Sequence, residues 1–275
     1  MSKSYDLSTS SKWANLADGD HVVKLRAKGA GYGSSSFSNS VTVTKSSIVM
    51  PVKGDLITIE SKQYRVLKTN GSVAEVLAMY DATTSQKFDA HSGIANVYAD
   101  NSLDVYCNET FYDTLSATMK AAIVEKTFTQ DEWSYAKGSS SITGTKIYRA
   151  VDSSSNQYRI GLTNAAKGDS ISRNCYVLSV QDVIDYLEVT TDMTVSNTTL
   201  TALNVWKMFW NKTTANSQDA WLRSASYSTV NAGYAFIAFG QTGDVASGGI
   251  QYAHAVRPAF QIDLSKIEWT PVGGN

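Results

Sequence analysis

The spacing of apolar residues changes along the chain, and the change predicts which elements form. After residue 51, Ile57 and Ile59 alternate with polar positions, and a second apolar run returns after Asn70-Gly71. Alternation around an Asn-Gly turn predicts a β-hairpin, here part of a short meander. From Ser102 onward the apolar positions recur every three or four residues, a spacing typical of amphipathic helices. We therefore expect strands to be followed by helices in one α+β domain.

Two serines are placed to begin helices. Ser116 precedes an apolar series that includes Met119 and Ile123, and Ser179 precedes a series that includes Val183 and Ile184. Serine is a preferred N-cap because its hydroxyl accepts a bond from an unpaired N–H of the first turn. A third helical segment is expected at 198–210, with its Trp, Met and Phe side chains in the core. The Ser-, Gly- and Asn-rich residues 134–174 are expected to be irregular, with possible strands at 145–151 and 158–163.

The first 45 residues have a pattern of their own. An Asp18-Gly19 turn, Val22, Leu25 and the Val41/Val43 pair predict short antiparallel strands. The segment resembles the last strands of a fibronectin type III or immunoglobulin-like domain, but it is too short for a sandwich of about seven strands. We expect a partial β module at 1–45, a linker at 46–50 and a main domain at 51–275.

Composition excludes several classes of function. The 24 basic and 25 acidic residues give a net charge of −1, and no basic block would attract nucleic acid. The N-terminal stretch is polar, so no signal peptide is expected, and no apolar run of about 18 residues predicts membrane insertion. The two cysteines, Cys107 and Cys175, are far apart and are expected to be buried free thiols in preference to one disulfide.

No pattern of catalytic or metal-ligating residues is visible. His21, His91 and His254 are scattered without metal-ligand spacing, and neither a GxSxG elbow nor a phosphate-binding loop occurs. The acidic pairs Asp131/Glu132 and Asp182/Asp185 are interpreted as helix-start or solvated acids. We therefore expect no enzyme activity, no cofactor and no metal.

The stretch from Trp221 to Pro258 has the composition of a binding surface. Its ends, WLRS and AVRPAF, are apolar with one arginine each, while its middle is rich in Tyr, Ser, Asn, Thr and Gly. Tyrosine offers a large contact area at low entropy cost, and Ser, Gly and Asn supply adaptable hydrogen bonds. Arg223 and Arg257 are expected to bond backbone carbonyls or a buried carboxylate. In GYAFIAFG, strand alternation implies that only one of two faces is exposed.

Several blocks occur in a recognisable order: ITIESKQYRVL, SLDVYCNETFYDTLS, LSVQDVIDYL, WLRSA and AVRPAFQIDL. Together they resemble a bacterial and phage family with a C-type-lectin-like domain, some members of which are variable proteins of diversity-generating retroelements. The resemblance covers roughly residues 50–268. It implies an α+β fold with small antiparallel sheets, flanking helices and a loop-rich ligand face. It also implies a rigid frame around a variable region at 221–258.

The resemblance assigns positions to both parts. The frame comprises Trp221, Arg223, Arg257 and Pro258. The ligand-contacting positions are those whose side chains adenine-directed mutagenesis of asparagine codons would generate: Tyr227, Ser228, Thr229, Asn231, Tyr234, Phe239, Asp244, Ser247, Tyr252 and His254. Gln241 and Gln251 depart from this pattern, because adenine changes in such codons cannot produce glutamine.

What the resemblance implies is a recognition protein on a phage tail or bacterial cell surface, with a host-surface protein or glycan as partner. The alternative is a structural tail-fibre or baseplate decoration that contacts virion tail proteins or copies of itself. True C-type lectins bind calcium and sugar through a carboxylate, amide and proline triplet that is not found here. Formylglycine-generating oxidases share the broad fold, but they need paired cysteines near the C-terminus, and no cysteine follows Cys175.

Overall fold

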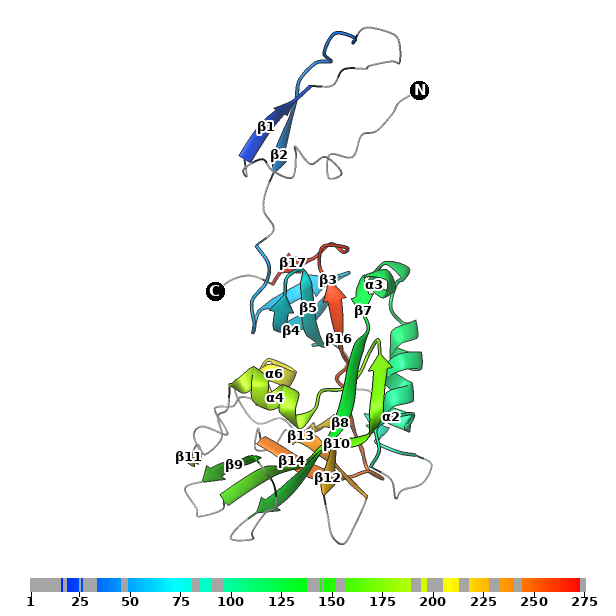
Figure 1. The fold of residues 1–275 in the computed structure, drawn as a ribbon, viewed down its shortest axis with the longest axis vertical. Coiled ribbons are helices and arrows are strands. Elements are labelled where there is room, and N and C mark those ends of the chain that lie inside the picture. The colour runs from blue at the N-terminus through cyan, green and yellow to red at the C-terminus, as the bar shows by residue number, and fades with distance from the viewer. Residues whose placement is uncertain are drawn as a thin grey trace. The chain divides into compact units, whose positions relative to one another are not determined.

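The structure is a computed structural model. It describes residues 16, 19–24, 26, 34–45, 49–80, 85–90, 96–137, 144, 146–151, 157–188, 194–196, 205–212, 218–227, 233–239 and 244–272. The chain divides into two units, Met1–Met50 and Pro51–Asn275. The first unit contains an antiparallel pair, β1 (Gly19–Val23) and β2 (Val41–Lys45) (Figure 1). The strands predicted at Val22 and at Val41/Val43 are confirmed, whereas Asp18 and Leu25 lie outside the described residues.

The second unit opens with the predicted meander, which belongs to a six-stranded antiparallel sheet. Its spatial order is β17-β3-β4-β5-β16-β7. The strands are β3 (Leu56–Ile59), β4 (Lys62–Asn70), β5 (Val73–Ala78), β7 (Ile123–Val124), β16 (Ala259–Asp263) and β17 (Thr270–Pro271). The expected hairpin joins β4 to β5, with Gly71 at φ +60° in the turn. Glycine adopts this left-handed conformation without steric cost.

A nine-stranded sheet forms the other half of this unit, in the order β11-β9-β10-β8-β12-β13-β14, with β15 beside β12 and β6 beside β15. The strands are β6 (Ser85–Lys87), β8 (Lys126–Lys137), β9 (Lys146–Val151), β10 (Gln157–Arg173), β11 (Thr194–Ser196), β12 (Ala220–Tyr227), β13 (Tyr234–Phe239), β14 (Asp244–Gly249) and β15 (Ala253–Ala255). Most neighbours are antiparallel, but β12 runs parallel to β8 and to β15, and β11 runs parallel to β9.

The expectation of an irregular 134–174 segment is wrong for most of its length. Strands do form at the two predicted places, but β10 continues to Arg173 and pairs with β8 throughout. Three register shifts interrupt this pairing, between Leu162 and Ser170. Each bulge moves the side chains of one strand out of simple alternation, so the pattern of period two is lost although the strand continues.

The helices are short and flank the sheets (Figure 1). They are α2 (Ser102–Val105), the π-helix η2 (Tyr106–Phe111), α3 (Ala117–Ala122), α4 (Val180–Leu187) and α6 (Val205–Trp210). Ser116 and Ser179 accept N-cap hydrogen bonds as predicted, from the backbone of Met119 and Asp182. Ile123, expected in a helix, begins β7 instead, because the adjacent β-branched pair Ile123-Val124 favours a strand.

The described unit is therefore an α+β domain in which sheets dominate. Met208, Phe209 and Trp210 of α6 are buried as expected, whereas the side chain of Trp206 lies outside the description. The prediction of two buried free thiols is confirmed for Cys107 and Cys175, and burial raises the pKa of both. Among the described helices, none combines the length and apolar character needed to cross a membrane.

Candidate ligand-recognition surface

Strand β12 supplies the first part of the frame around the candidate surface. Its residues from Ala220 to Ser226 are all buried, and Tyr227, its last residue, is the first to reach solvent. The indole Nε1 of Trp221 donates a 2.7 Å hydrogen bond to the carbonyl of Gln86 on β6. A strand buried on both faces cannot shift its register without exposing apolar side chains, so Tyr227 starts from a fixed position.

Arg223 makes both kinds of contact expected from the sequence. Its guanidinium lies 2.7 Å from the Asp182 carboxylate and donates a 2.7 Å bond to the carbonyl of Val177. It also lies over the ring of Phe128, 4.3 Å from the centroid. Burial alone would raise the pKa of Asp182, but the adjacent Arg223 and Lys126 charges hold it well below its ordinary value. The frame therefore contains a charged pair that is stabilised inside the fold.

Lys126 extends this pair into a network that joins the two sheets. Its ammonium lies 2.6 Å from Glu75 on β5 and 3.5 Å from Asp182 on α4. Glu75 also accepts a 2.6 Å bond from the hydroxyl of Tyr176 and pairs with Lys68 at 2.9 Å. Burial and the nearby Asp182 raise the pKa of Glu75. The effect of Lys126 and Tyr176, which lower this pKa, is larger, so the pKa of Glu75 lies below its ordinary value. Alternating charges thus tie β5, β8, α4 and β12 together.

Asp131 has a different role from the one predicted. It lies in β8, not at a helix start, and it is buried. Its carboxylate accepts hydrogen bonds from the Ser224 hydroxyl and, at 2.7 Å, from the Trp133 indole. Glu132 is also in β8 and pairs with Lys167 at 2.7 Å. The interpretation as helix-start or solvated acids is therefore wrong for this pair, because bulged pairing with β10 buries a strand that looks polar in sequence.

The second acidic pair fits the prediction better. Asp182 belongs to the first turn of α4, where its carboxylate accepts a 2.9 Å bond from the backbone N–H of Ser179 and completes a capping box. Asp185 is exposed on the same helix and accepts a 2.7 Å bond from Gln181. Asp182 is thus a helix-start acid that the fold also uses as a charge partner for Arg223.

The other end of the frame is held by backbone contacts. Arg257 is buried, and its Nη1 lies 3.4 Å from the carbonyls of both Ala78 and Tyr80. The expectation that it bonds backbone carbonyls is confirmed. Pro258 is also buried, and its carbonyl accepts a 2.9 Å bond from the N–H of Ala78. The WLRS and AVRP blocks are therefore both parts of the packed interior.

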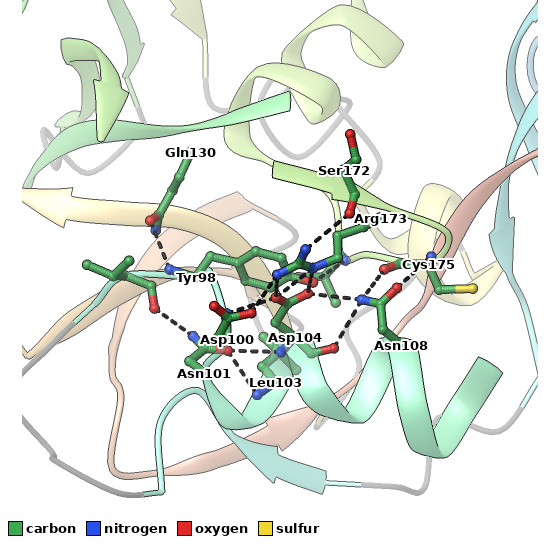
Figure 2. A network of polar contacts seen from close by, with 12 residues as sticks. Tyr98, Asp100, Asn101, Leu103, Asp104, Asn108, Gln130, Ser172, Arg173 and Cys175 are labelled. Carbon is green, nitrogen blue, oxygen red and sulfur yellow. Dashed lines mark hydrogen bonds and ion pairs between the residues drawn. The ribbon is translucent and has the colours of Figure 1, made fainter. Parts of the chain in front are cut away.

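A second polar network fixes the α2–η2 helical run against β10 (Figure 2). Asp104 is buried and lies 2.7 Å from Nη2 of Arg173, and its carboxylate accepts a 2.9 Å bond from Asn108. Asn108 also donates to the carbonyl of Cys175 at 2.8 Å. Asn101 caps α2 by accepting bonds from the N–H groups of Leu103 and Asp104. Each carboxylate oxygen of Asp104 has donors, so this cluster stabilises the fold and leaves no free acid.

Three predicted contact positions lie at one end of the nine-stranded sheet. Tyr227 ends β12, Tyr234 begins β13 opposite Gly249 of β14, and the N–H of Tyr252 donates to the carbonyl of Gly249 at 3.0 Å. Tyr227 is 42% exposed and Tyr252 is 62% exposed, while Tyr234 is half-buried. We call these three residues the tyrosine edge.

Two residues that the sequence did not single out hold this edge in place. The amide of Asn96 donates to the carbonyl of Ser226 at 3.1 Å and to that of Tyr234 at 2.7 Å. Gln130 in turn donates to the carbonyls of Asn96 and Arg223, at 2.8 and 2.7 Å. Both amides are buried. Neither amide belongs to a spacing pattern in the sequence, so only contacts such as that of Gln130 with Arg223, more than 90 positions away, reveal the role.

Two of the other predicted positions, Phe239 and Asp244, lie away from the tyrosine edge. Phe239 and Asp244 pair at the opposite end of β13 and β14, about 17 Å away for five residues of strand. Their side chains lie outside the description, as do all of Ser228, Thr229 and Asn231. Ser247 is half-buried opposite Phe236 within the sheet. Phe239 and Asp244 therefore lie away from the tyrosine edge, and the assignment of all ten positions to one ligand surface stays a prediction.

His254 is placed against the frame. Its ring meets that of Trp221 edge-on, with centroids 4.6 Å apart, and its Nδ1 lies 3.6 Å from the Asp219 carboxylate. Burial lowers the pKa of His254, and Asp219 offsets part of that shift. Across the described ranges, no group of three or more His, Cys, Asp or Glu side chains could hold a metal ion.

The alternation predicted for β13 does not produce an exposed face. Ala235, Phe236, Ile237 and Ala238 are all buried, so other parts of the chain, including α6, cover both faces of β13. The expectation that one set of these side chains is exposed is therefore wrong. Tyr227, at the end of β12, is the large side chain of these strands that is exposed in the described ranges.

One family matches the chain. The domain described as "Domain of unknown function (DUF6273)" matches residues 73–264, which is more than half of the chain. The chain belongs to this family. No curated protein and no solved structure matches it. The DUF6273 match begins with β5 and ends just after β16, so it includes the frame, the tyrosine edge and both polar networks except Lys68.

Proposed function

We propose that this DUF6273 protein is a ligand-binding variable protein with a C-type-lectin-like fold. In this proposal it is displayed on a phage tail or a bacterial cell surface. Its partner is a host-surface protein or glycan, and the tyrosine edge makes the contact. The partner therefore meets aromatic side chains, and the protein carries out no chemical reaction.

The observation that carries the proposal is the contrast within β12. Seven consecutive buried residues fixed by Arg223, Ser224 and Trp221 end in the exposed Tyr227. Tyr252 is also exposed, its N–H is bonded to Gly249, and Asn96 holds the carbonyls of Ser226 and Tyr234 together. Exposed tyrosines on a rigid support lose little entropy on binding and are enriched where proteins recognise partners.

Replacement of the two exposed tyrosines tests the contact. The variant Tyr227→Ala/Tyr252→Ala should lose binding of the fluorescently labelled protein to a panel of bacterial cells that the native chain labels. Its unfolding midpoint should stay within a few degrees of the native value, because both side chains are at the surface. The matched control is Tyr112→Ala/Tyr186→Ala, which removes two half-buried tyrosines from helices elsewhere. Equal cell labelling by all three proteins would contradict the proposal.

The variation mechanism has its own test in the surrounding DNA. A near-copy of the segment that encodes residues 221–258, differing at adenines and lying beside a reverse-transcriptase gene, is the expected finding. Without such a copy the tyrosine edge would be a fixed binding surface, and the retroelement part of the proposal would fall.

A structural decoration role is the second candidate, and the first unit favours it. Val22, Phe37 and Val41 are exposed by 67, 60 and 61% in a unit whose described strands form only one hairpin. An isolated hairpin is marginally stable in water, and association would cover these side chains. Light scattering distinguishes the roles. A native oligomer that Val22→Asp/Val41→Asp converts to monomer supports assembly, whereas a native monomer contradicts it.

A further inference from the structure

A cavity of about 270 Å³ lies beside the π-helix, and none of the three tyrosines of the tyrosine edge lines it. It is formed where β4, the end of the β5 segment, the helical run and the chain before β16 meet. Its lining residues are Lys62, Tyr80, Tyr106, Thr110, Phe111, Thr114, Val256 and Pro258. A volume of this size is close to the lower end for small-molecule sites in proteins. It accommodates one ring or one branched aliphatic group.

The π-helix determines which side chains face this cavity. Backbone bonds in a π-helix join residue i to residue i+5, so Tyr106 and Phe111 lie one turn apart. In an α-helix the same two residues would point in different directions, since 3.6 residues complete a turn. Both in fact line the cavity, together with Thr110 between them. Single π-turns are rare and often occur at functional sites, which agrees with this placement.

The aromatic wall is held in place before any ligand arrives. The rings of Tyr80 and Phe111 are stacked at 6.3 Å, and the Tyr80 hydroxyl lies 3.0 Å from the hydroxyl of buried Tyr64. Thr114 donates its hydroxyl hydrogen to the carbonyl of Phe111 at 2.6 Å. A preformed wall lowers the ordering cost of binding.

The charge of the cavity selects the ligand. The ammonium of Lys62 lies 4.8 Å from the centre of the Tyr80 ring and forms no ion pair with a carboxylate among the described residues. No Asp or Glu belongs to the described lining. A cation and the hydroxyl of Thr110 next to aromatic and aliphatic walls complement an anion that carries an apolar body.

We propose that this cavity binds a carboxylate attached to an aromatic or branched apolar group. The carboxylate pairs with Lys62 and accepts a bond from Thr110, and the apolar body lies against Phe111, Val256 and Pro258. Free aromatic acids and the C-terminal residue of a polypeptide share this chemistry. The site is independent of the tyrosine edge.

Ligand-observed NMR titration of the full chain with phenylacetate tests the proposal. Phenylacetate should bind with a dissociation constant of about 1 mM, as expected for a fragment of this size. Lys62→Gln should weaken binding about tenfold, because a charge-assisted bond is lost. Thr110→Phe should abolish it by filling the cavity from an exposed position. Lys266→Gln, which changes an exposed lysine elsewhere, should bind as the native chain does.

Neutral phenylacetamide and cationic benzylamine complete the design. Both should bind more weakly than phenylacetate, and Lys62→Gln should remove that preference. A tripeptide ending in Phe that binds more tightly than phenylacetate, with its C-terminal amide inactive, would identify a polypeptide terminus as the source. Tighter binding of phenylacetate than of the tripeptide would identify a free acid as the source. No saturable binding of either acid, or equal binding by Lys62→Gln, would overturn the proposal. Tyr227→Ala/Tyr252→Ala should bind phenylacetate normally, so this site and the proposed recognition surface can fail separately.

Discussion

Asp182 serves both as a helix cap and as a charge partner, and a conservative substitution separates the two roles. Asp182→Asn keeps an oxygen that can accept the N–H of Ser179 but removes the charge that faces Arg223 at 2.7 Å. Breaking a buried pair costs about 3 kcal/mol because the remaining charge stays uncompensated. We therefore expect the free energy of unfolding, measured by urea titration, to fall by about this amount.

The matched control lies on the same helix. Asp185→Asn removes an exposed carboxylate, and surface changes of this kind usually alter stability by less than about 0.5 kcal/mol. Equal losses for the two variants would mean that the charge on Asp182 is not what stabilises the frame.

The burial of His254 predicts that the stability of the fold depends on pH. Burial lowers its pKa in the folded chain, so below the unfolded value of about 6.5 the unfolded chain binds more protons. Burial of the neutral ring therefore contributes its full stability above the unfolded pKa, and this contribution is lost as the pH falls below it. We expect the unfolding free energy to decrease between pH 7.5 and 5.5. In His254→Phe, which retains an aromatic ring against Trp221, the decrease should be smaller. An unchanged pH profile in this variant would assign the dependence to other groups.

At the scale of elements, the β3–β4 hairpin is strained by its turn residues. Glu60 and Ser61 have φ values of +48° and +65°, a conformation that costs non-glycine residues about 1 kcal/mol or more. Ser61→Gly should raise the unfolding free energy by about 0.5 kcal/mol after the entropy cost of glycine is subtracted. Ser61→Ala is the control, since alanine retains the strain. A gain in the alanine variant equal to that in the glycine variant would show that the turn conformation is not the cause.

The elements that local sequence determines were predictable, and those that depend on distant partners were not. The caps at Ser116 and Ser179, the hairpin after Asn70 and the strand at Tyr234 follow from residues within one turn or one strand. The length of β10 does not follow from its own residues, because its bulged strand is held by pairing with β8. The π-turn likewise has no local pattern, since its helix is held by Asp104 and Asn108 against Arg173 and Cys175.

The candidate site divides in the same way. The frame role of Trp221, Arg223 and Arg257 could be predicted because large apolar residues and arginines between apolar neighbours must find buried partners. Whether a side chain of β13 reaches solvent could not be predicted, since that depends on which elements, such as α6, pack against the two faces of the sheet. Asn96 and Gln130 were missed for a related reason, because their partners are carbonyls at strand ends far along the chain.

At the scale of the molecule, the second unit should fold without the first. The two sheets, the helices and both buried networks all lie between residues 51 and 275. A chain of residues 51–275 should therefore unfold in one cooperative transition with a midpoint within about 3 °C of the full chain, which for a domain of this size is about 1 kcal/mol. Differential scanning calorimetry measures this directly. A lower midpoint by 10 °C, or loss of cooperativity, would show that residues 1–50 complete the core.

The long pairing of β8 with β10 also determines how the protein would carry a mechanical load. Their register includes eleven paired positions, and β12 lies parallel to β8 next to Tyr227. Tension applied along β8 from the tyrosine edge would act on many ladder bonds at once, in shear, so no single bond would have to break first.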